Sequence, residues 1–212
     1  SDEGVRRNQG RVGAAAGPQV LRQVLAGLPV HFDAARRLVD LGDVCCEDQD
    51  LERAQATLAD AVCAIRAGSG FPIILGGGHE LTYAHFKGLQ KAQRGSIGII
   101  NIDAHLDLRE PIAGAANSGT GFYQIAEACK LQGQAFHYLA LGIQEISNTK
   151  ALFQRAETLG VSIVSAHELQ CQRQETMQKI QAFTQAVDQV YLTVDMDAFA
   201  AAFAPGVSAV AM

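Results

Sequence analysis

Short apolar runs alternate along this chain with longer segments in which apolar residues recur at helical spacing. Five runs predict β-strands, because each is rich in apolar residues and ends at glycine or polar residues. They are FPIIL (71–75), IGIINI (97–102), FHYLALGI (136–143), VSIVSA (161–166) and QVYLTVDMD (189–197). Strands with little alternation of apolar and polar residues are typical of a parallel sheet covered on both faces.

The segments between these runs predict helices. The helices are expected over 17–28 with Pro18 at the first position, from about 51 to Gly68, over 80–93, around Phe122, Ile125 and Cys129, and over 148–160. A further helix follows Ser165, which forms a capping box with Glu168, and it presents Leu169, Ile180, Phe183 and Val187. Strands that alternate with helices indicate βαβ units, so we expect a single α/β domain over 1–212.

Ionisable side chains gather where three of the predicted strands end. His79 follows the first strand and a triple glycine, Asp103, His105 and Asp107 follow the second, and Asp195 and Asp197 end the last. In an extended chain, the spacing i, i+2, i+4 places side chains on one face at steps of about 6.5 Å. Ligands of parallel α/β sheets collect beyond the carboxyl ends of the strands. We therefore expect two histidines and four aspartates to converge on one site.

Four carboxylates in one pocket need cations, because they repel one another and cannot all stay ionised away from water. Two divalent ions would supply four positive charges. A set of ligands that is mostly oxygen suits Mn²⁺ better than Zn²⁺, and two ions about 3.5–4 Å apart can share a bridging hydroxide. Taken singly, Asp103 is also a helix-cap or turn residue and His79 a turn residue. A phosphate site is disfavoured because Leu81 replaces the third glycine of G-x-G-x-x-G.

Composition narrows the class of protein. The net charge of −5 gives no electrostatic footprint for nucleic acid. No apolar run approaches the ~18 residues of a membrane span, and no signal-peptide pattern is present. The five cysteines form no C-x-x-C pair, which predicts reduced thiols and a cytoplasmic location. Both ends look cut, because Ser1 is not an initiator and Met212 directly follows AFAPGVSAV, which reads as an active-site loop.

Three segments together resemble a known family. GGGHE (76–80), NIDAHLDLR (101–109) and LTVDMDAFAAAFAPGVSA (192–209) are similar to the signature segments of the ureohydrolase family, which includes arginase, agmatinase and formimidoylglutamase. EGVRRNQGRVGAAAGPQVLR (3–22) is similar to the N-terminal loop of that family. The resemblance implies a three-layer α/β/α arginase-like fold with a mainly parallel central sheet. It also implies two Mn²⁺ per subunit and a homo-oligomer, a trimer or a hexamer.

The resemblance also implies a role for each metal ligand. One ion would be held by His79, Asp103, Asp107 and Asp195, and the other by Asp103, His105, Asp195 and Asp197. Asp103 and Asp195 would bridge the two ions. The bridging hydroxide would attack an sp² carbon bound to nitrogen, and Asp107 would pass a proton to the leaving nitrogen.

Two departures favour the formimidoylglutamase branch of the family. Arg109 stands where arginase-like sequences carry Asn, and its guanidinium can pair with a substrate carboxylate. Ser118 stands where the others carry a proton-shuttling His. The implied substrate is N-formimidoyl-L-glutamate, a small molecule with two carboxylates, which water converts to L-glutamate and formamide. Arg11, or less favourably Arg7, would bind the second carboxylate.

The sequence also allows other interpretations. Arg109 could instead form a structural ion pair with a neighbouring acid. Arg11 could be a solvated surface residue, and Ser118 could be a turn residue without a role in binding. An agmatinase or another guanidino ureohydrolase is an alternative, and so is a non-catalytic family member with an incomplete site. His31, His85, His137 and His167 are interpreted as structural or surface residues.

Overall fold

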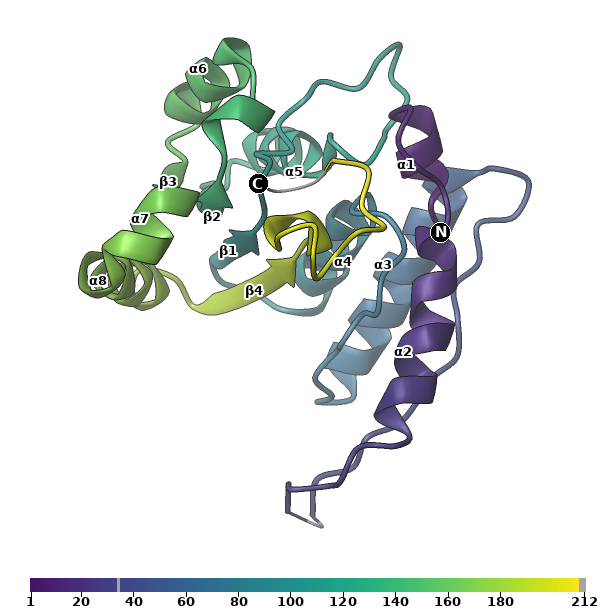
Figure 1. The fold of residues 1–212 in the computed structure, drawn as a ribbon. Coiled ribbons are helices and arrows are strands. Elements are labelled where there is room, and N and C mark those ends of the chain that lie inside the picture. Colours follow the sequence, from purple (N-terminus) through teal and green to yellow (C-terminus); the bar gives the residue numbers. More distant parts are fainter. Residues whose placement is uncertain (34, 210–212) are drawn as a thin grey trace.

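Four parallel strands form the centre of the molecule. The computed structural model describes residues 1–33 and 35–209. Strand β1 (Ile97–Ile102) pairs with β2 (His137–Ile143) on one side and β4 (Gln189–Val194) on the other, and β3 (Ser162–Ser165) pairs with β2. The strand order is therefore β3-β2-β1-β4 (Figure 1).

Helices cover both faces of this sheet. On one face, α4 (Leu81–Ala92), α5 (Gly121–Leu131) and α6 (Lys150–Thr158) bury the larger core, and α3 (Leu51–Ala67) packs outside α4. On the other face, α8 (Arg173–Gln185) contributes Ile180 and Phe183 to a smaller core with β1, β2 and β3. The expected three-layer α/β/α arrangement is confirmed.

Strand β1 shows why its sequence lacks alternation. Ile97 and Ile99 belong to the larger core, whereas Ile100 belongs to the smaller one. Both faces of the strand are thus buried, and both need apolar side chains. Gly98 faces α8 closely, because a Cβ added there would lie 2.8 Å from Phe183.

The predicted first strand is wrong. Residues 71–75 adopt no strand, and Phe71 and Ile73 are 83% and 66% exposed. A strand exists only through pairing, and among the described residues β4 forms the edge of the sheet without another strand beside it. The apolar character of residues 71–75 could not show that no strand pairs with them among the described residues.

The other predicted elements are present, but one predicted helix is broken and several boundaries differ. The capping box of Ser165 and Glu168 is confirmed, but it opens only the short helix α7 (Ala166–Cys171). A second helix, α8, starts after Gln172, whose ψ of 53° is not helical, and it ends before Val187. The last predicted strand also stops early, because a 3₁₀ turn, η3 (Met196–Ala198), follows Val194.

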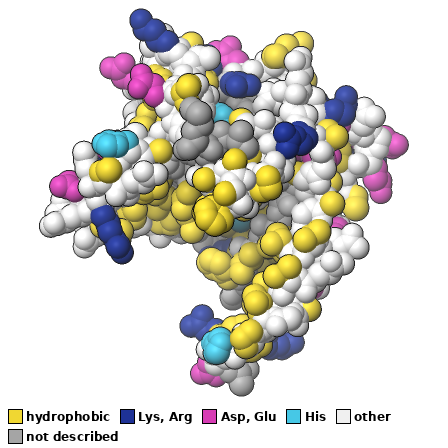
Figure 2. Space-filling view, viewed as in Figure 1, with side chains coloured by type: hydrophobic (Ala, Val, Ile, Leu, Met, Phe, Trp, Pro, Cys, Tyr) yellow, Lys and Arg dark blue, Asp and Glu magenta, His cyan; other side chains and the backbone are white. Residues whose placement is uncertain are grey.

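The N-terminal region is attached beside this α/β core. It contains α1 (Glu3–Arg7), the 3₁₀ turn η1 (Ala14–Ala16) and α2 (Gly17–Leu25). Another 3₁₀ turn, η2 (Glu145–Ser147), lies in the α/β core, where it follows β2. Apolar side chains of α2 and the segment after it are exposed, among them Val20, Val24, Leu25 and Leu28 (Figure 2). No helix among the described residues is long and apolar enough to cross a membrane.

Candidate metal centre

Most of the predicted metal ligands lie just after the ends of two neighbouring strands, β1 and β4. Asp103 follows β1 directly, and Asp195 follows β4 directly. The ladder continues across this boundary, since the Asp195 N–H donates to Ile102 O at 2.9 Å and the Asp103 N–H donates to Leu141 O at 3.0 Å. The carboxyl ends of β1 and β4 therefore set these two aspartates side by side.

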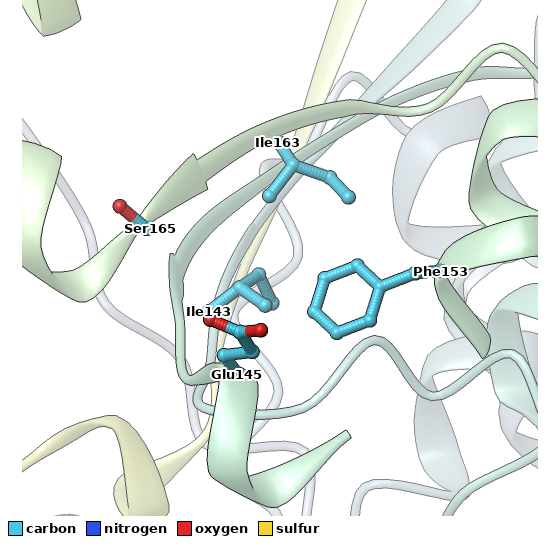
Figure 3. A pocket seen from close by; sticks show the side chains of 5 residues that line it. All are labelled: Ile143, Glu145, Phe153, Ile163 and Ser165. Carbon is cyan, nitrogen blue, oxygen red and sulfur yellow. The ribbon is translucent and has the colours of Figure 1, made fainter. Parts of the chain in front are cut away.

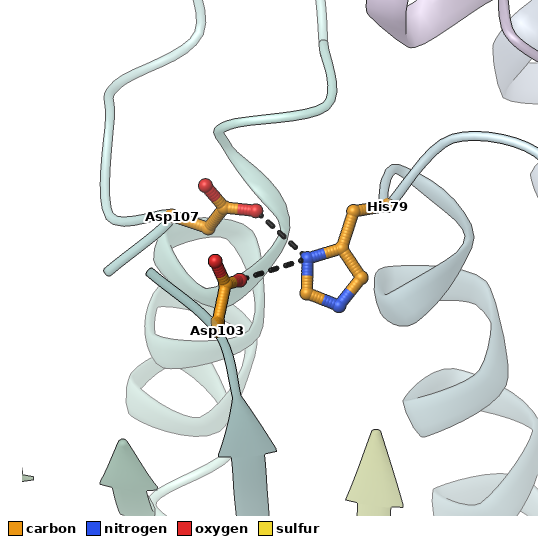
Figure 4. Close-up of side chains that lie close together, drawn as sticks. All are labelled: His79, Asp103 and Asp107. Carbon is orange, nitrogen blue, oxygen red and sulfur yellow. Dashed lines mark hydrogen bonds and ion pairs between the residues drawn. The ribbon is translucent and has the colours of Figure 1, made fainter. Parts of the chain in front are cut away.

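His79 completes the first half of the cluster. It lies in the turn before α4, and its Nδ1 is 2.9 Å from Asp107 Oδ2 and 3.3 Å from Asp103 Oδ2 (Figure 4). The same nitrogen lies 3.4 Å from Asp195 Oδ2. One imidazole nitrogen thus faces three carboxylates from two strand ends.

The second half of the cluster forms around His105. Its Nδ1 is 2.9 Å from Asp197 Oδ2 and 3.5 Å from Asp103 Oδ1. Asp197 lies in η3, where its N–H donates to Asp195 Oδ1 at 2.9 Å. Asp103 is therefore common to both halves, and the structure brings all six predicted side chains together.

The route of the chain between these ligands differs from the prediction. Residues 103–105 form bends rather than extended strand. Asp107 has a φ of 47°, a left-handed conformation that non-glycine residues adopt uncommonly and that aspartate tolerates better than most. Ala104 and Leu106, which lie between these ligands, are buried in the core. The aspartates converge because the chain turns back, not because they lie on one face of a strand.

The charges of the cluster depend strongly on one another. Burial raises the pKa of Asp107 to about 6, with a further contribution from Asp103, and burial likewise raises the pKa of Asp197 to about 7. Hydrogen bonds to Asp103 and Asp197 raise the pKa of His105 to about 10. Several protons therefore remain on the metal-free cluster near pH 7.

At the centre of the cluster, contacts between histidine and aspartate shift the pKa values of His79 and Asp103 in the direction opposite to the effect of burial. Burial alone would lower the pKa of His79, but the charge of Asp195 and its contacts with Asp103 and Asp107 raise it. Burial would raise the pKa of Asp103, but hydrogen bonds from both histidines hold it well below its usual range. In the metal-free protein the two histidines thus offset part of the negative charge of the four aspartates.

The donor set fits two divalent cations. His79, Asp103 and Asp107 form one group and Asp103, His105 and Asp197 a second, and the candidate ligand atoms of each group lie within 4.8 Å of one another. Both groups are buried or half-buried and consist of carboxylate oxygens with one imidazole each. Such oxygen-rich sets suit Mn²⁺.

Sequence reasoning missed the residues that hold the ligands. The Asn101 amide donates to Asp103 Oδ2 at 3.0 Å and to the Tyr138 hydroxyl at 3.1 Å, and Asn101 is fully buried. His79 Nε2 lies 3.0 Å from the Thr193 hydroxyl. The signal for Asn101 was present, because a single amide inside an apolar strand needs a buried partner.

The loop between β1 and α5 is tied down separately. Asn148, just before α6, accepts from the Leu106 N–H at 3.0 Å and donates to Ala104 O at 2.9 Å. The Phe122 N–H donates to Asp107 O at 3.2 Å. These bonds fix the backbone on both sides of the metal-ligand segment.

Arg109 and Ser118 share one neighbour, Asn8. The Arg109 guanidinium donates to Asn8 Oδ1 at 3.0 Å, and Asn8 Nδ2 donates to the Ser118 hydroxyl at 3.0 Å. Arg109 is exposed, and it forms no ion pair with an acid among residues 1–33 and 35–209. The structural reading, in which a neighbouring acid neutralises Arg109, thus has no support in the described part of the chain.

The two N-terminal arginines differ in their contacts. Arg7 pairs with Glu52 at 2.6 Å and with Glu3 at 3.1 Å, so its charge is already compensated. Arg11 donates from Nη1 to Pro205 O at 3.0 Å, and its N–H donates to Ser208 Oγ at 2.7 Å. Arg11 therefore contacts the loop that follows Asp197, and its guanidinium binds a neutral carbonyl.

The remaining histidines lie apart from the cluster. His85 is buried against the Tyr191 ring, with ring centroids 4.5 Å apart, and burial lowers the pKa of His85 to about 4. His31 and His167 are exposed, and His137 begins β2 at the opposite end of the sheet.

A cavity of about 200 Å³ lies near the carboxyl ends of β2 and β3. Its lining is mainly apolar and consists of Ile143, Glu145, Phe153, Ile163 and Ser165 (Figure 3). None of the predicted metal or substrate residues lines it.

Comparison with known proteins identifies the class that this fold and cluster define. The family model described as "Arginase family" matches residues 3–212. The chain belongs to the arginase family.

Within that family, several curated relatives of this chain are formimidoylglutamases. That of Paraburkholderia xenovorans is 49% identical over 222 residues, covering 99% of this chain and 68% of the relative. That of Aeromonas hydrophila is 46% identical over 211 residues, covering 98% of this chain and 66% of the relative. The chain thus spans about two thirds of the length of these relatives.

Solved structures agree with this placement. The structure of Trypanosoma cruzi formiminoglutamase with Mn²⁺ matches with a TM-score of 0.87 at 28% identity, covering 99% of this chain and 72% of that one. Formimidoylglutamase from Bacillus subtilis matches with a TM-score of 0.81 at 25% identity, covering 94% and 64%. The arginase-like fold is confirmed.

Proposed function

We propose that this chain hydrolyses N-formimidoyl-L-glutamate to L-glutamate and formamide. The observation that carries the proposal is the guanidinium of Arg109, which follows the metal-ligand segment and binds only the neutral Asn8 side chain among the described residues. An unpaired guanidinium favours an anionic substrate and repels a cationic one such as agmatine. The names of the curated relatives support the same reaction.

Six residues of this chain would hold two Mn²⁺ per subunit: His79, Asp103, His105, Asp107, Asp195 and Asp197. Bound Mn²⁺ would supply the Lewis acidity that makes water a nucleophile at neutral pH. Asp103 belongs to both groups of ligand atoms, which supports a bridging role for it. Asp195 lies beside His79 and Asp197, which supports the same role.

Asp107 would move the proton. Its Oδ2 contacts His79, whereas no described residue hydrogen-bonds to its Oδ1. This oxygen can accept a proton from the attacking water and return it to the nitrogen that leaves as the amino group of glutamate. Since the leaving nitrogen needs a proton to depart, Asp107 would act as base and then as acid.

Arg109 and Arg11 would bind the two carboxylates of the substrate, and Ser118 would donate a hydrogen bond to it. The Ser118 hydroxyl accepts from Asn8, so its own proton stays available for an acceptor. A cytoplasmic location and a homo-oligomeric state, trimer or hexamer, stay predictions from the sequence.

The test is a substrate comparison with the purified, Mn²⁺-loaded protein. Formamide and glutamate should appear from N-formimidoyl-L-glutamate, and urea should not appear from agmatine or arginine. Arg109→Gln should raise KM for the substrate at least about tenfold, the size of one lost charge-assisted contact, while bound Mn²⁺ stays unchanged. Urea formation from either guanidino compound would overturn the assignment. Failure to retain Mn²⁺ at all would favour a non-catalytic family member.

A further inference from the structure

A buried carboxylate lies directly beside the metal-ligand turn without facing the metal cluster. Glu80 follows His79, is 1% exposed, and points toward α1. Its Oε1 accepts from the Gly4 N–H at 3.1 Å and from the Ser1 hydroxyl at 3.3 Å. The carboxylate thus connects two segments 76 residues apart in the sequence.

Two glycines leave the space that this carboxylate fills. A Cβ added to Gly4 would lie 2.6 Å from Glu80 Cβ, and one added to Gly78 would lie 1.9 Å from Glu80 Oε2. Neither position can carry a side chain while Glu80 keeps its place. We call Gly4, Gly78 and Glu80 the interlock, because each occupies the space that the others leave open.

The interlock is anchored on the side of the metal cluster. The carbonyl of Glu80 accepts from the Gln55 side chain at 2.7 Å, and Gln55 is itself buried in α3. The carbonyl of His79 accepts from the Thr82 N–H at 3.1 Å. The turn that carries His79 is therefore fixed to two helices, and Glu80 extends from a rigid support.

On its other side, the interlock reaches the residues proposed to bind substrate. Gly4 O accepts from the Ser118 N–H at 3.1 Å and from the Asn8 N–H at 3.0 Å. Asn8 in turn joins the Ser118 hydroxyl to the Arg109 guanidinium. Hydrogen bonds of Gly4 therefore connect Glu80 to Ser118 directly and to Arg109 through Asn8.

We propose that Glu80 is a positioning residue that sets, through Gly4 and Asn8, where Arg109 and Ser118 lie relative to the metal ligand His79. This inference rests on the proposed function, in which Arg109 and Ser118 contact the substrate. A carboxylate suits the task because it accepts two hydrogen bonds with one oxygen and cannot turn away between two glycines.

The kinetic test compares Glu80→Ala with the nearly isosteric Glu80→Gln, which retains an acceptor for Gly4. Glu80→Ala should raise KM for N-formimidoyl-L-glutamate about tenfold or more, because small displacements of binding groups are costly. Its kcat and bound Mn²⁺ should stay within about threefold of the wild type, and Glu80→Gln should retain most of the affinity. Glu157→Ala, which changes an exposed glutamate, is the matched control.

A double variant tests the path through Asn8. Asn8→Ala should raise KM by itself, and adding it to Glu80→Ala should raise KM little further, because both changes act on the same pair of residues. Full additivity of the two effects would contradict the path. A fall in bound Mn²⁺ with an unchanged KM would also overturn the proposal, because Glu80 would then support His79 instead.

Hydrogen exchange tests the interlock independently of the reaction. In Glu80→Ala and in Gly4→Ala, the backbone amides of α1 should exchange faster, while those of β1 and α5 should not change. Gly27→Ala is the matched glycine control, since the nearest atom to an added Cβ there lies at an ordinary 3.6 Å. Unchanged exchange in α1 would refute the interlock itself. Faster exchange without activity on this substrate in the wild type would refute only the proposed function.

Discussion

Asp103 is held from two directions by the protein itself. The His105 N–H donates to its Oδ1 at 2.7 Å, and the Asn101 amide donates to its Oδ2. Residues around a metal ligand fix its orientation and tune its basicity, although they never touch the ion. At the scale of single residues, the orientation of Asp103 is thus set by a backbone N–H and by an amide side chain, Asn101, that is not itself a proposed metal ligand.

Thr193 is the partner of His79 whose role can be isolated by substitution. With Nδ1 facing the carboxylates, the Nε2–H of His79 donates to the Thr193 hydroxyl, which fixes the ring. Thr193→Val keeps the shape and removes the acceptor, so Mn²⁺ affinity should fall about 10- to 100-fold. Thr193→Ser should keep it, and titration of the metal-free variants with Mn²⁺ would show the difference. Equal affinity in all three proteins would exclude this role.

At the scale of elements, helix α7 begins with a capping box that the sequence already predicts. Ser165 Oγ accepts from the Glu168 N–H at 3.1 Å, and the Glu168 carboxylate accepts from the Ser165 N–H at 2.8 Å. Ser165→Ala should reduce the free energy of unfolding by about 1 kcal/mol. Urea denaturation would measure this, with Ser162→Ala in the exposed part of β3 for comparison. A loss no larger than that of the control would mean that the cap adds no stability.

Elements were predictable from sequence where local pattern decides them, and not where a partner does. The strand at Ile97–Ile102 is apolar throughout and buried on both faces, so its assignment needed no knowledge of its neighbours. Residues 71–75 look the same but pair with nothing among the described residues. The six clustered side chains were predictable as a set, because ionisable residues at the ends of several parallel strands meet at one edge of the sheet and need bound cations to offset their repulsion. Asn8 and Glu80 were not, because the partners in these contacts lie 76 to 110 residues away in the sequence.

At the scale of the whole molecule, the cluster should couple metal binding to pH. In the metal-free protein, the pKa of His105 is about 10 and that of Asp197 about 7, both above their ordinary values. Mn²⁺ binds the deprotonated ligands, so it must displace these protons at pH 7. Apparent affinity should therefore rise as pH increases from about 6 toward 10, and binding should release protons.

Calorimetry in buffers of different ionisation enthalpy would count the released protons. Thermal unfolding with Mn²⁺ at about 100 times its Kd should show a stabilisation of about 2.7 kcal/mol for each bound ion, since the unfolded chain lacks the site. An affinity that does not change with pH would contradict the protonation states described for the metal-free cluster.

The left-handed backbone at Asp107 has a consequence for which residues this position can accept. Aspartate, asparagine and glycine tolerate that conformation, whereas longer or β-branched side chains pay a steric penalty. Glutamate offers the same carboxylate and yet would strain the chain at the point where it bends away toward Arg109. The geometry of the main chain therefore limits the choice of residue here beyond the need for a carboxylate, and it ties the choice of one donor to the direction of the loop.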